Sequence, residues 1–202
     1  MPTPIVMLFD LGGVLVKSNG QSALRQLLPH MTDEQVLDRW NRSKAVGLFE
    51  RGQLAQAQFA AAFVKEWDLP MTESAFLNAF ATWVAGYFDG TMPLVQALRA
   101  EYRIGCLSNT NVVHWERLAE LIEQFHFSFA SHITGLMKPD RRAYDHVVRT
   151  LGIQPSDVYF FDDLLPNVAA AREMGINAFL ATCPQDVESI LQMHHLLPSE
   201  RT

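Results

Sequence analysis

Four groups of polar residues follow short apolar runs, and their side chains are of types that do chemistry. They are Asp10, the stretch Ser108 to Asn111, Lys138, and the pair Asp162 and Asp163. If the apolar runs are parallel strands, their carboxyl ends meet at one edge of a sheet, which is where open α/β sheets bind ligands. We therefore expect three carboxylates, a hydroxyl and an ammonium to converge on one crevice.

This set of groups is suited to phosphoryl chemistry. Carboxylate oxygens are hard ligands, and no sulfur or imidazole accompanies them, so the metal they imply is magnesium rather than zinc. A magnesium ion, a lysine and a hydroxyl beside backbone N–H groups would neutralise a phosphoryl group during transfer. One carboxylate would then be free to act as nucleophile and form an aspartyl-phosphate.

Each group taken alone also has an ordinary structural interpretation. Asp10 and Ser108 to Asn111 could cap the segments that follow them. Lys138, which precedes a proline, could be a solvated turn residue. Asp162 and Asp163 could interact with the dipole of the next helix. The occurrence of all four groups in order at strand ends is what favours a functional site.

The apolar runs predict the elements that would position these residues. Continuous runs of strand length, typical of strands buried on both faces, lie at 5–9, 104–107, 158–161 and 178–181, with a weaker run at 132–134. Helical patterns lie between them at 93–99, 112–124, 140–151 and 167–174. This alternation predicts an α/β fold with a doubly wound parallel sheet.

The stretch from Lys17 to Gly90 interrupts the alternation and contains no convincing strand. Thr32 and Gln35 have the spacing of a capping box at a helix start. Aromatic residues recur at helical spacing, namely Phe59, Phe63, Trp67, Phe76, Phe80, Tyr87 and Phe88, with Val84 in the same pattern. We expect them to form a core of their own rather than a ligand cage.

The sequence thus predicts two units in one chain. Residues 1–16 and 91–202 would form the α/β core, and residues 17–90 would form a small helical cap inserted after the first strand. Trp40 and Phe49 could face the crevice from this cap, although packing inside the cap explains them equally well.

Four ordered motifs in this sequence resemble those of the haloacid dehalogenase-like hydrolase superfamily. They are Phe9-Asp10-Leu11-Gly12-Gly13-Val14-Leu15, Leu107-Ser108-Asn109-Thr110-Asn111, Met137-Lys138-Pro139 and Phe161-Asp162-Asp163. The helical insertion is similar to the small (C1) cap of that superfamily. Phe49-Glu50-Arg51-Gly52 and Tyr144-Asp145-His146-Val147 further resemble the bacterial α-D-glucose-1-phosphate phosphatases.

The resemblance implies a metal site and a nucleophile. Asp10 would attack phosphorus and would also bind Mg²⁺. The backbone carbonyl of Gly12 and the carboxylate of Asp163 would be further ligands, while Asp162 would bind the metal directly or through a water molecule.

The resemblance also implies residues that bind the phosphoryl group. Ser108 and Lys138 would hold its oxygens, and Asn109 would assist through its N–H or its side-chain amide. Asn167 would contribute indirectly.

Gly12 is the one departure from the pattern of the superfamily. Most phosphatases of this superfamily carry a second Asp two residues after the nucleophile, which acts as general acid and then as base. Losing such help typically costs roughly a hundredfold to ten-thousandfold in rate. A sugar 1-phosphate would tolerate the loss best, because its anomeric hydroxyl is a comparatively acidic leaving group. The glucose-1-phosphate phosphatases also lack this Asp.

We therefore expect a Mg²⁺-dependent phosphatase that hydrolyses a small phosphorylated metabolite, with glucose 1-phosphate as a candidate substrate. Two alternatives stay open. A 2-haloacid dehalogenase would use the same nucleophile without a metal, and a catalytically weak member of the superfamily would serve as a binding or interaction protein.

Composition bounds the partners and the location. The chain of 202 residues has 16 basic and 22 acidic side chains, a net charge of −6 with no basic cluster, so we expect no nucleic-acid partner. No signal peptide or membrane span is predicted, which indicates a cytoplasmic protein. Cys106 and Cys183 are expected to be reduced core thiols. We expect a monomer or a weak homodimer.

Overall fold

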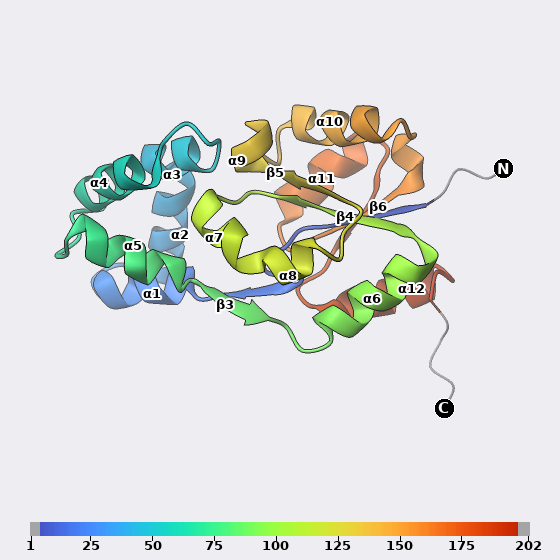
Figure 1. Cartoon of the computed structure of the whole chain (residues 1–202), viewed down its shortest axis with the longest axis horizontal. Coiled ribbons are helices and arrows are strands. Elements are labelled where there is room, and N and C mark those ends of the chain that lie inside the picture. Colours follow the sequence, from blue (N-terminus) through green and yellow to red (C-terminus); the bar gives the residue numbers. More distant parts are fainter. Residues whose placement is uncertain (1–4, 198–202) are drawn as a thin grey trace.

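The computed structural model describes residues 5–197 and contains a parallel sheet of five strands between two layers of helices (Figure 1). The strands are β1 (Val6–Phe9), β4 (Arg103–Ser108), β5 (Phe127–Ala130), β6 (Val158–Asp162) and β7 (Asn177–Leu180). Their order in the sheet is β5-β4-β1-β6-β7, with every neighbouring pair parallel. The predicted doubly wound α/β fold is confirmed.

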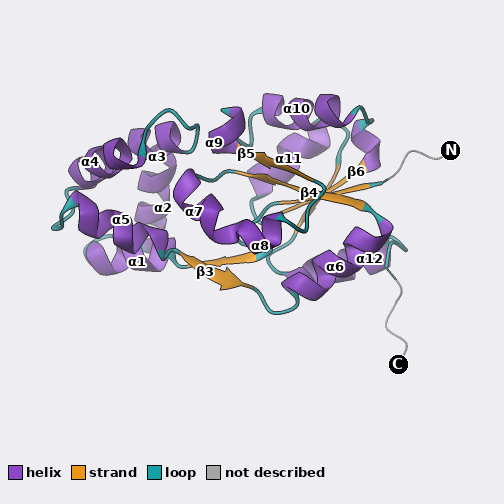
Figure 2. Ribbon diagram, viewed as in Figure 1, coloured by secondary structure: helices purple, strands orange, loops and turns teal. Residues whose placement is uncertain are grey.

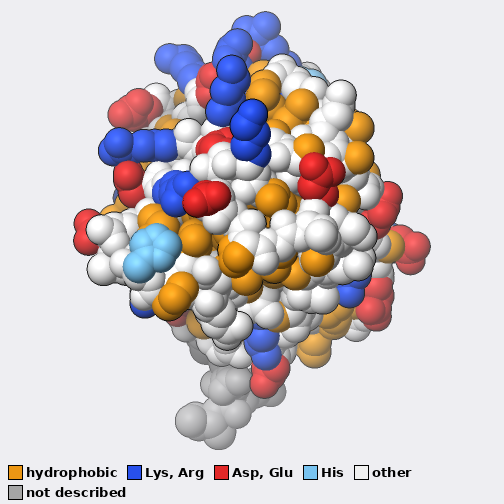
Figure 3. All heavy atoms as spheres, turned by 90° about the vertical axis from the view of Figure 1, so that its left-hand side faces the viewer, with side chains coloured by type: hydrophobic (Ala, Val, Ile, Leu, Met, Phe, Trp, Pro, Cys, Tyr) orange, Lys and Arg blue, Asp and Glu red, His pale blue; other side chains and the backbone are white. Residues whose placement is uncertain are grey.

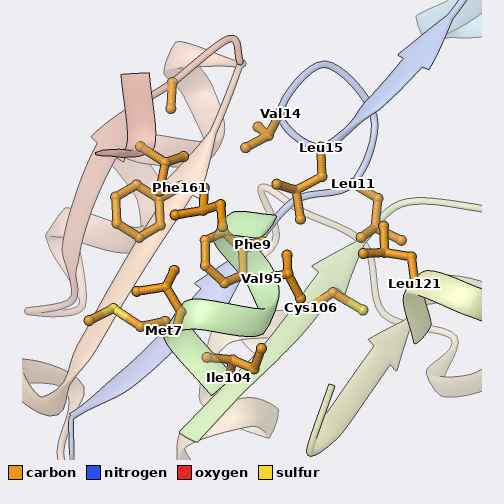
Figure 4. Close-up of a cluster of buried hydrophobic side chains, with 14 of the residues drawn as sticks. Met7, Phe9, Leu11, Val14, Leu15, Val95, Ile104, Cys106, Leu121 and Phe161 are labelled. Atoms are coloured by element: carbon orange, nitrogen blue, oxygen red, sulfur yellow. The ribbon is translucent and has the colours of Figure 1, made fainter. Parts of the chain in front are cut away.

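The central strand β1 is buried on both faces, which explains why its sequence is continuously apolar. Met7 and Phe9 pack in one hydrophobic cluster, shown in Figure 4 with side chains from the neighbouring strands. Val6 and Leu8 pack in a second cluster on the opposite face. All four side chains are fully buried. Two-sided burial of this kind requires apolar residues at every position rather than at alternate ones.

Helices cover both faces of the sheet (Figure 2). The second cluster is covered by α10 (Arg141–Leu151) and α11 (Leu165–Glu173), and a short 3₁₀ turn η2 (Pro155–Asp157) precedes β6. The first cluster is covered by α6 (Thr91–Glu101), α7 (Val112–Trp115), η1 (Glu116–Leu118), α8 (Ala119–Ile122) and α12 (Pro184–Met193). The sheet, these helices and the loops between them are called the sheet region below.

Five further helices form a separate group at one end of the molecule (Figure 1, left). They are α1 (Gly20–Leu27), α2 (Asp33–Arg42), α3 (Lys44–Phe49), α4 (Gln56–Trp67) and α5 (Glu73–Ala81), called the helical group below. Its buried aromatic rings pack on one another, with the centroids of Phe49 and Phe59 4.1 Å apart. The predicted capping box is present, since Thr32 accepts from the Gln35 N–H and the Gln35 side chain accepts from the Thr32 N–H.

Two short strands join the helical group to the sheet region, which corrects the prediction that residues 17–90 contain no strand. β2 (Val16–Ser18) pairs antiparallel with β3 (Val84–Tyr87). Val84 and Tyr87 therefore do not continue the helical pattern. The chain enters and leaves the helical group at one place, and pairing the two crossing segments satisfies their backbone hydrogen bonds.

Three smaller predictions are also wrong. The weak strand is at β5, and residues 132–134 belong instead to the short helix α9 (Ser131–Thr134), where Ile133 is 68% exposed. The predicted helix at 112–124 is broken into α7, η1 and α8. Both cysteines are free, but only Cys106 lies in the core, because Cys183 is partly exposed just before α12.

The exposed end of the helical group carries basic and acidic side chains next to one another, with hydrophobic ones between them (Figure 3). Two ion pairs of the helical group, Arg25 with Asp33 and Arg42 with Asp38, are at least partly exposed. Within residues 5–197, no helix has both the length and the apolar character needed to cross a membrane.

Candidate active site

The strand register brings the predicted polar residues to one edge of the sheet. Phe9, the last residue of β1, lies opposite both Cys106 and Phe161, so that β1, β4 and β6 end within two residues of one another. The Asp10 N–H donates to the Phe161 carbonyl oxygen at 2.8 Å, which fixes the backbone just beyond β1. Ser108 and Asp162 are the last residues of β4 and β6.

A buried lysine lies at the centre of this edge. The Lys138 Nζ is 3.0 Å from Asp10 Oδ1 and 2.6 Å from Asp162 Oδ2, and only 1% of its side chain is exposed. Burial alone would lower the pKa of Lys138, but the two carboxylates raise it above the ordinary value. The ammonium is therefore charged and compensates carboxylates that would otherwise be costly to bury.

Asp10 keeps one carboxylate oxygen free. Its Oδ1 accepts from the Leu11 N–H at 2.7 Å and contacts Lys138, whereas no donor within residues 5–197 reaches its Oδ2. Burial raises the pKa of Asp10 to about 7, Lys138 lowers it, and the negative charges of Asp162 and Asp163 raise it further. A carboxylate in this position is poised to accept a cation or to react.

Asp10, Asp162 and Asp163 each place a carboxylate oxygen within 4.8 Å of the others. Burial, followed by the charge of Asp162, raises the pKa of Asp163 to about 6. Gly13 has a φ of 78°, and a Cβ at this position would overlap the Asp163 carboxylate, so the loop after β1 can approach Asp163 only because residue 13 is glycine. A set of crowded oxygen ligands of this kind fits a hard divalent cation.

The three carboxylates are not equivalent. Both oxygens of Asp162 accept from the Asn167 side-chain amide, at 2.9 and 3.1 Å, and Oδ1 also accepts from the Leu164 N–H. With Lys138 on Oδ2, the Asp162 carboxylate is fully engaged. Its observed contacts are those of an anchor for Lys138. Asn167 acts on Asp162, and its own carbonyl accepts from the Tyr144 hydroxyl.

Asn109 links the loop after β4 to the loop that carries Lys138. Its side-chain amide donates to the Lys138 carbonyl at 2.8 Å and accepts from the Lys138 N–H at 2.9 Å. The amide is thus occupied, and the group that Asn109 still offers a ligand is its backbone N–H. The Ser108 hydroxyl has no hydrogen-bond partner within the described part of the chain, although the residue is 4% exposed.

A cavity of about 250 Å³ lies between this edge of the sheet and the helical group. The sheet region lines it with Leu11, Gly12, Ser108, Asn109, Thr110 and His114, and the lining from the helical group and its flanks includes Leu24, Val36, Trp40, Glu50 and Trp83. Trp40 therefore does face the crevice, whereas Phe49 is buried in the core of the helical group. Most of the helical side is apolar.

Two cavity residues, Glu50 and His114, were not singled out from the sequence as site residues. Burial raises the pKa of Glu50 to about 7, the neighbouring Arg51 lowers it, and Asp10 raises it. Burial lowers the pKa of His114, which stacks on Phe80. The available signal for Glu50 was its position in Phe49-Glu50-Arg51-Gly52, a polar residue between a buried aromatic residue and a glycine turn.

This fold and site define an α/β enzyme with an acidic centre and a buried lysine at the carboxyl ends of its strands. The sequence model of the haloacid dehalogenase-like hydrolases matches residues 6–175. The chain belongs to this family.

Relatives and solved structures agree with that assignment. Flavin mononucleotide hydrolase 1 of Arabidopsis thaliana is 29% identical over 70% of this chain and 57% of its own length. The chain thus spans little more than half of this relative. The D-ribitol-5-phosphate phosphatase of Bacteroides thetaiotaomicron is 24% identical over 86% of this chain and 89% of its own length.

Among solved structures, a haloacid dehalogenase family enzyme from Bacteroides thetaiotaomicron, in a magnesium complex, superimposes with a TM-score of 0.78. It is 20% identical, and the match covers 94% of this chain and 98% of that one. The likeness shows that the two chains share a fold.

Proposed function

We propose that the protein is a Mg²⁺-dependent phosphatase that hydrolyses a small phosphorylated metabolite through an aspartyl-phosphate on Asp10. The observation that carries this proposal is the free Oδ2 of Asp10, which lies on a carboxylate whose other oxygen is held by Lys138 and the Leu11 N–H. Because Oδ1 is held, the carboxylate cannot rotate and Oδ2 is oriented for attack. The Lys138 ammonium beside it neutralises the charge of an incoming phosphoryl group.

The acidic cluster is the proposed metal site. Asp10, Asp163 and the Gly12 backbone carbonyl would be the ligands, while Asp162, next to them, holds Lys138. When bound, Mg²⁺ supplies positive charge that stabilises the transferring phosphoryl group. The close approach of three carboxylates is the arrangement that such a cation would stabilise.

The remaining residues bind the phosphoryl group. The Ser108 hydroxyl, the Asn109 N–H and the Lys138 ammonium are the donors at this edge that would hold its oxygens. As Asp10 Oδ2 bonds to phosphorus, the bond from phosphorus to the ester oxygen breaks. Water then attacks the phosphoaspartate and restores the Asp10 carboxylate.

We propose that the helical group acts as a cap over this site, with residues 17–90 as the cap and residues 1–16 and 91–202 as the core. The cavity between them supports this division. A lid of this kind would exclude water and select the substrate. The helical group and its flanks line their side of the cavity mainly with apolar side chains, including Trp40 and Trp83. The cavity would therefore take a leaving group that stacks on indole rings, as a sugar ring does.

A phosphate-release screen tests the proposal. The panel includes glucose 1-phosphate, D-ribitol 5-phosphate, flavin mononucleotide and p-nitrophenyl phosphate, each with Mg²⁺. We expect release from at least one compound, and its loss with EDTA or in Asp10→Asn. Beryllium fluoride with Mg²⁺ should form a stable phosphoaspartate mimic on Asp10.

Three outcomes would change the proposal. Absence of phosphate release from every compound would contradict a phosphatase. Halide release from 2-chloropropionate without metal would identify a dehalogenase. If neither reaction occurs and no beryllium fluoride adduct forms, the protein is a binding member of the family.

A further inference from the structure

The cavity contains few groups that can carry a proton. Of the described side chains that line it, Glu50 and His114 are the ones with an acidic or basic group, and burial lowers the pKa of His114. The His114 Nε2 is 2.9 Å from the Phe80 carbonyl, and its Nδ1 is 3.2 Å from the Asn111 amide nitrogen. Both ring nitrogens are therefore engaged in hydrogen bonds, and Glu50 is the titratable side chain left for a ligand.

Glu50 is held at the cavity wall by its neighbours in the chain. It directly follows α3, whose last residue, Phe49, is 2% exposed and stacks on Phe59. Two residues later, Gly52 has a φ of 72° and packs so closely on the His132 carbonyl that a Cβ there would overlap it. The segment is thus fixed on one side in the helical group and on the other against α9 of the sheet region.

The Glu50 carboxylate has no fixed partner within the described residues. No hydrogen bond or ion pair to it is formed, and the adjacent Arg51 instead donates to the Gly47 carbonyl at 2.8 Å. A partly buried carboxylate without a donor is unusual unless a ligand or a proton completes it. Its raised pKa, near 7, is consistent with a group that exchanges a proton at neutral pH.

On the side of the sheet region, the cavity that Glu50 lines is open next to Gly12. Gly12, two residues beyond Asp10, lines the cavity without a side chain, and a Cβ built on it would have no atom within 4 Å. Neither Lys138 nor Asp162 is free to protonate a leaving group, because each is engaged with the other. Among the described residues, the titratable side chain that the sheet region adds to the cavity lining is His114, and both of its ring nitrogens are already hydrogen-bonded.

We propose that Glu50, supplied by the helical group, is the general acid and then the general base of the phosphatase reaction. This inference rests on the proposed function. In the first step, Asp10 Oδ2 bonds to phosphorus, the bond to the ester oxygen breaks, and Glu50 gives its proton to that oxygen, so that a neutral alcohol leaves. In the second step, Glu50 takes a proton from water as the water oxygen bonds to phosphorus. The bond to Asp10 breaks, phosphate leaves, and Glu50 is again protonated.

The test compares Glu50→Gln with wild type on aryl phosphates of increasing phenol pKa and on the best substrate of the screen. Loss of general acid–base help should lower kcat/KM for the poorest leaving groups by about a hundredfold to ten-thousandfold, and by much less for p-nitrophenyl phosphate. Because the base is also missing, p-nitrophenyl phosphate should give a burst of p-nitrophenol followed by slow turnover, with phosphate held on Asp10.

A second variant separates proton transfer from simple disruption. Gly12→Asp places a carboxylate in the open space of the cavity that Glu50 also lines, so Gly12→Asp with Glu50→Gln should recover part of the lost activity on poor leaving groups. Glu73→Gln, an equal change at an exposed position in the first turn of α5, should behave as wild type.

The outcomes separate this inference from the proposed function. A uniform loss on all substrates in Glu50→Gln, with no burst and no rescue by Gly12→Asp, would overturn the role of Glu50 while leaving the phosphatase intact. Unchanged activity in Glu50→Gln would do the same. Wild-type protein that releases no phosphate from any compound would overturn both.

Discussion

The sheet region and the helical group bury different kinds of side chain. Within residues 5–197, the buried polar and charged residues are Asp10, Ser43, Thr91, Ser108, Thr110, Asn111, Ser131, Lys138, Asp162 and Asn167. Only Ser43 belongs to the helical group, which instead buries a cluster of Phe and Trp rings. The sheet region thus contains a connected polar network, whereas the helical group is held together by packing.

The two regions therefore contribute to the site in different ways. Polar networks hold donors and acceptors in position to within a fraction of an ångström, and the reacting groups need this precision. An aromatic core fixes shape and surface, which is what a cavity wall needs. Glu50 is the exception we propose, a reacting group carried by the packed region.

The largest expected effect is that of Lys138→Met. Removing the ammonium leaves Asp10 and Asp162 as uncompensated buried carboxylates, which should lower the free energy of unfolding by about 3–5 kcal/mol and abolish phosphate release. Denaturant unfolding and the release assay measure both losses. Lys17→Met is the control, because its pair with Asp89 is exposed and should contribute less than about 1 kcal/mol. Equal effects of the two variants would contradict a polar network at the site.

Phe59→Ala should be comparably destabilising but for the opposite reason. The Phe59 ring is fully buried among Phe49, Phe63 and Phe80, so its removal should cost about 3–5 kcal/mol through lost packing. Hydrogen exchange should report the loss mainly in α1–α5. Under folding conditions, Asp10 should still form the beryllium fluoride adduct, unlike in Lys138→Met. Loss of that adduct would show that the two regions are not separable.

The same contrast explains how much was predictable from sequence. Asp10 and Asp163 were predicted because buried parallel strands have continuous apolar runs, and polar residues directly after such runs must lie at one edge. Lys138 was placed by a strand at 132–134 that is in fact helix α9, so its position at this edge comes from the loop after α9. The helical group was found by the spacing of its aromatic residues. Both signals are local in the sequence, so one chain is enough to detect them.

What was missed depends on contacts between distant segments. β2 and β3 are short strands whose pairing is imposed by where the chain crosses between regions, and no alternation marks them. Glu50 reaches the cavity because Gly52 packs on His132, a contact across 80 residues. The use of the Asn109 amide to hold Lys138 likewise requires knowing that two loops meet. Local sequence patterns contain no information about such long-range contacts.

A smaller effect is expected from pH in the metal-free protein. Folding raises the pKa of Asp10 from 3.8 to about 7, and that of Asp163 to about 6, mainly by burial. Between about pH 4 and about pH 7 the folded chain therefore holds more protons than the unfolded chain, so this stability contribution is complete below pH 4 and is lost as pH rises. Mg²⁺ should flatten the dependence, because it favours the ionised carboxylates.

Denaturant unfolding at several pH values, with EDTA or with Mg²⁺, measures that dependence. Asp163→Asn in EDTA should reduce the slope, since it removes one of the carboxyl groups whose pKa is raised on folding, the others being Asp10 and Glu50. The exposed Glu73→Gln is again the control and should leave the slope as in wild type. An equal slope with and without Mg²⁺ would contradict a metal site at this acidic cluster.

The smallest expected effect is that of Thr32→Ala, at the start of α2. The Thr32 hydroxyl accepts from the Gln35 N–H at 3.2 Å in an exposed capping box, and losing such a cap typically costs about 1 kcal/mol. Thermal unfolding should show this loss, and phosphate release should be unchanged, because the cap touches neither the cavity nor the polar network.

Asn111→Ala removes the matched helix cap in the sheet region. Its side chain is buried, accepts from the His114 N–H at 3.1 Å and also holds the His114 ring. That variant should lose more stability and should also change KM, since it frees a ring that lines the cavity. If both variants altered stability alone, the polar residues of the sheet region would have no closer tie to the site than those of the helical group.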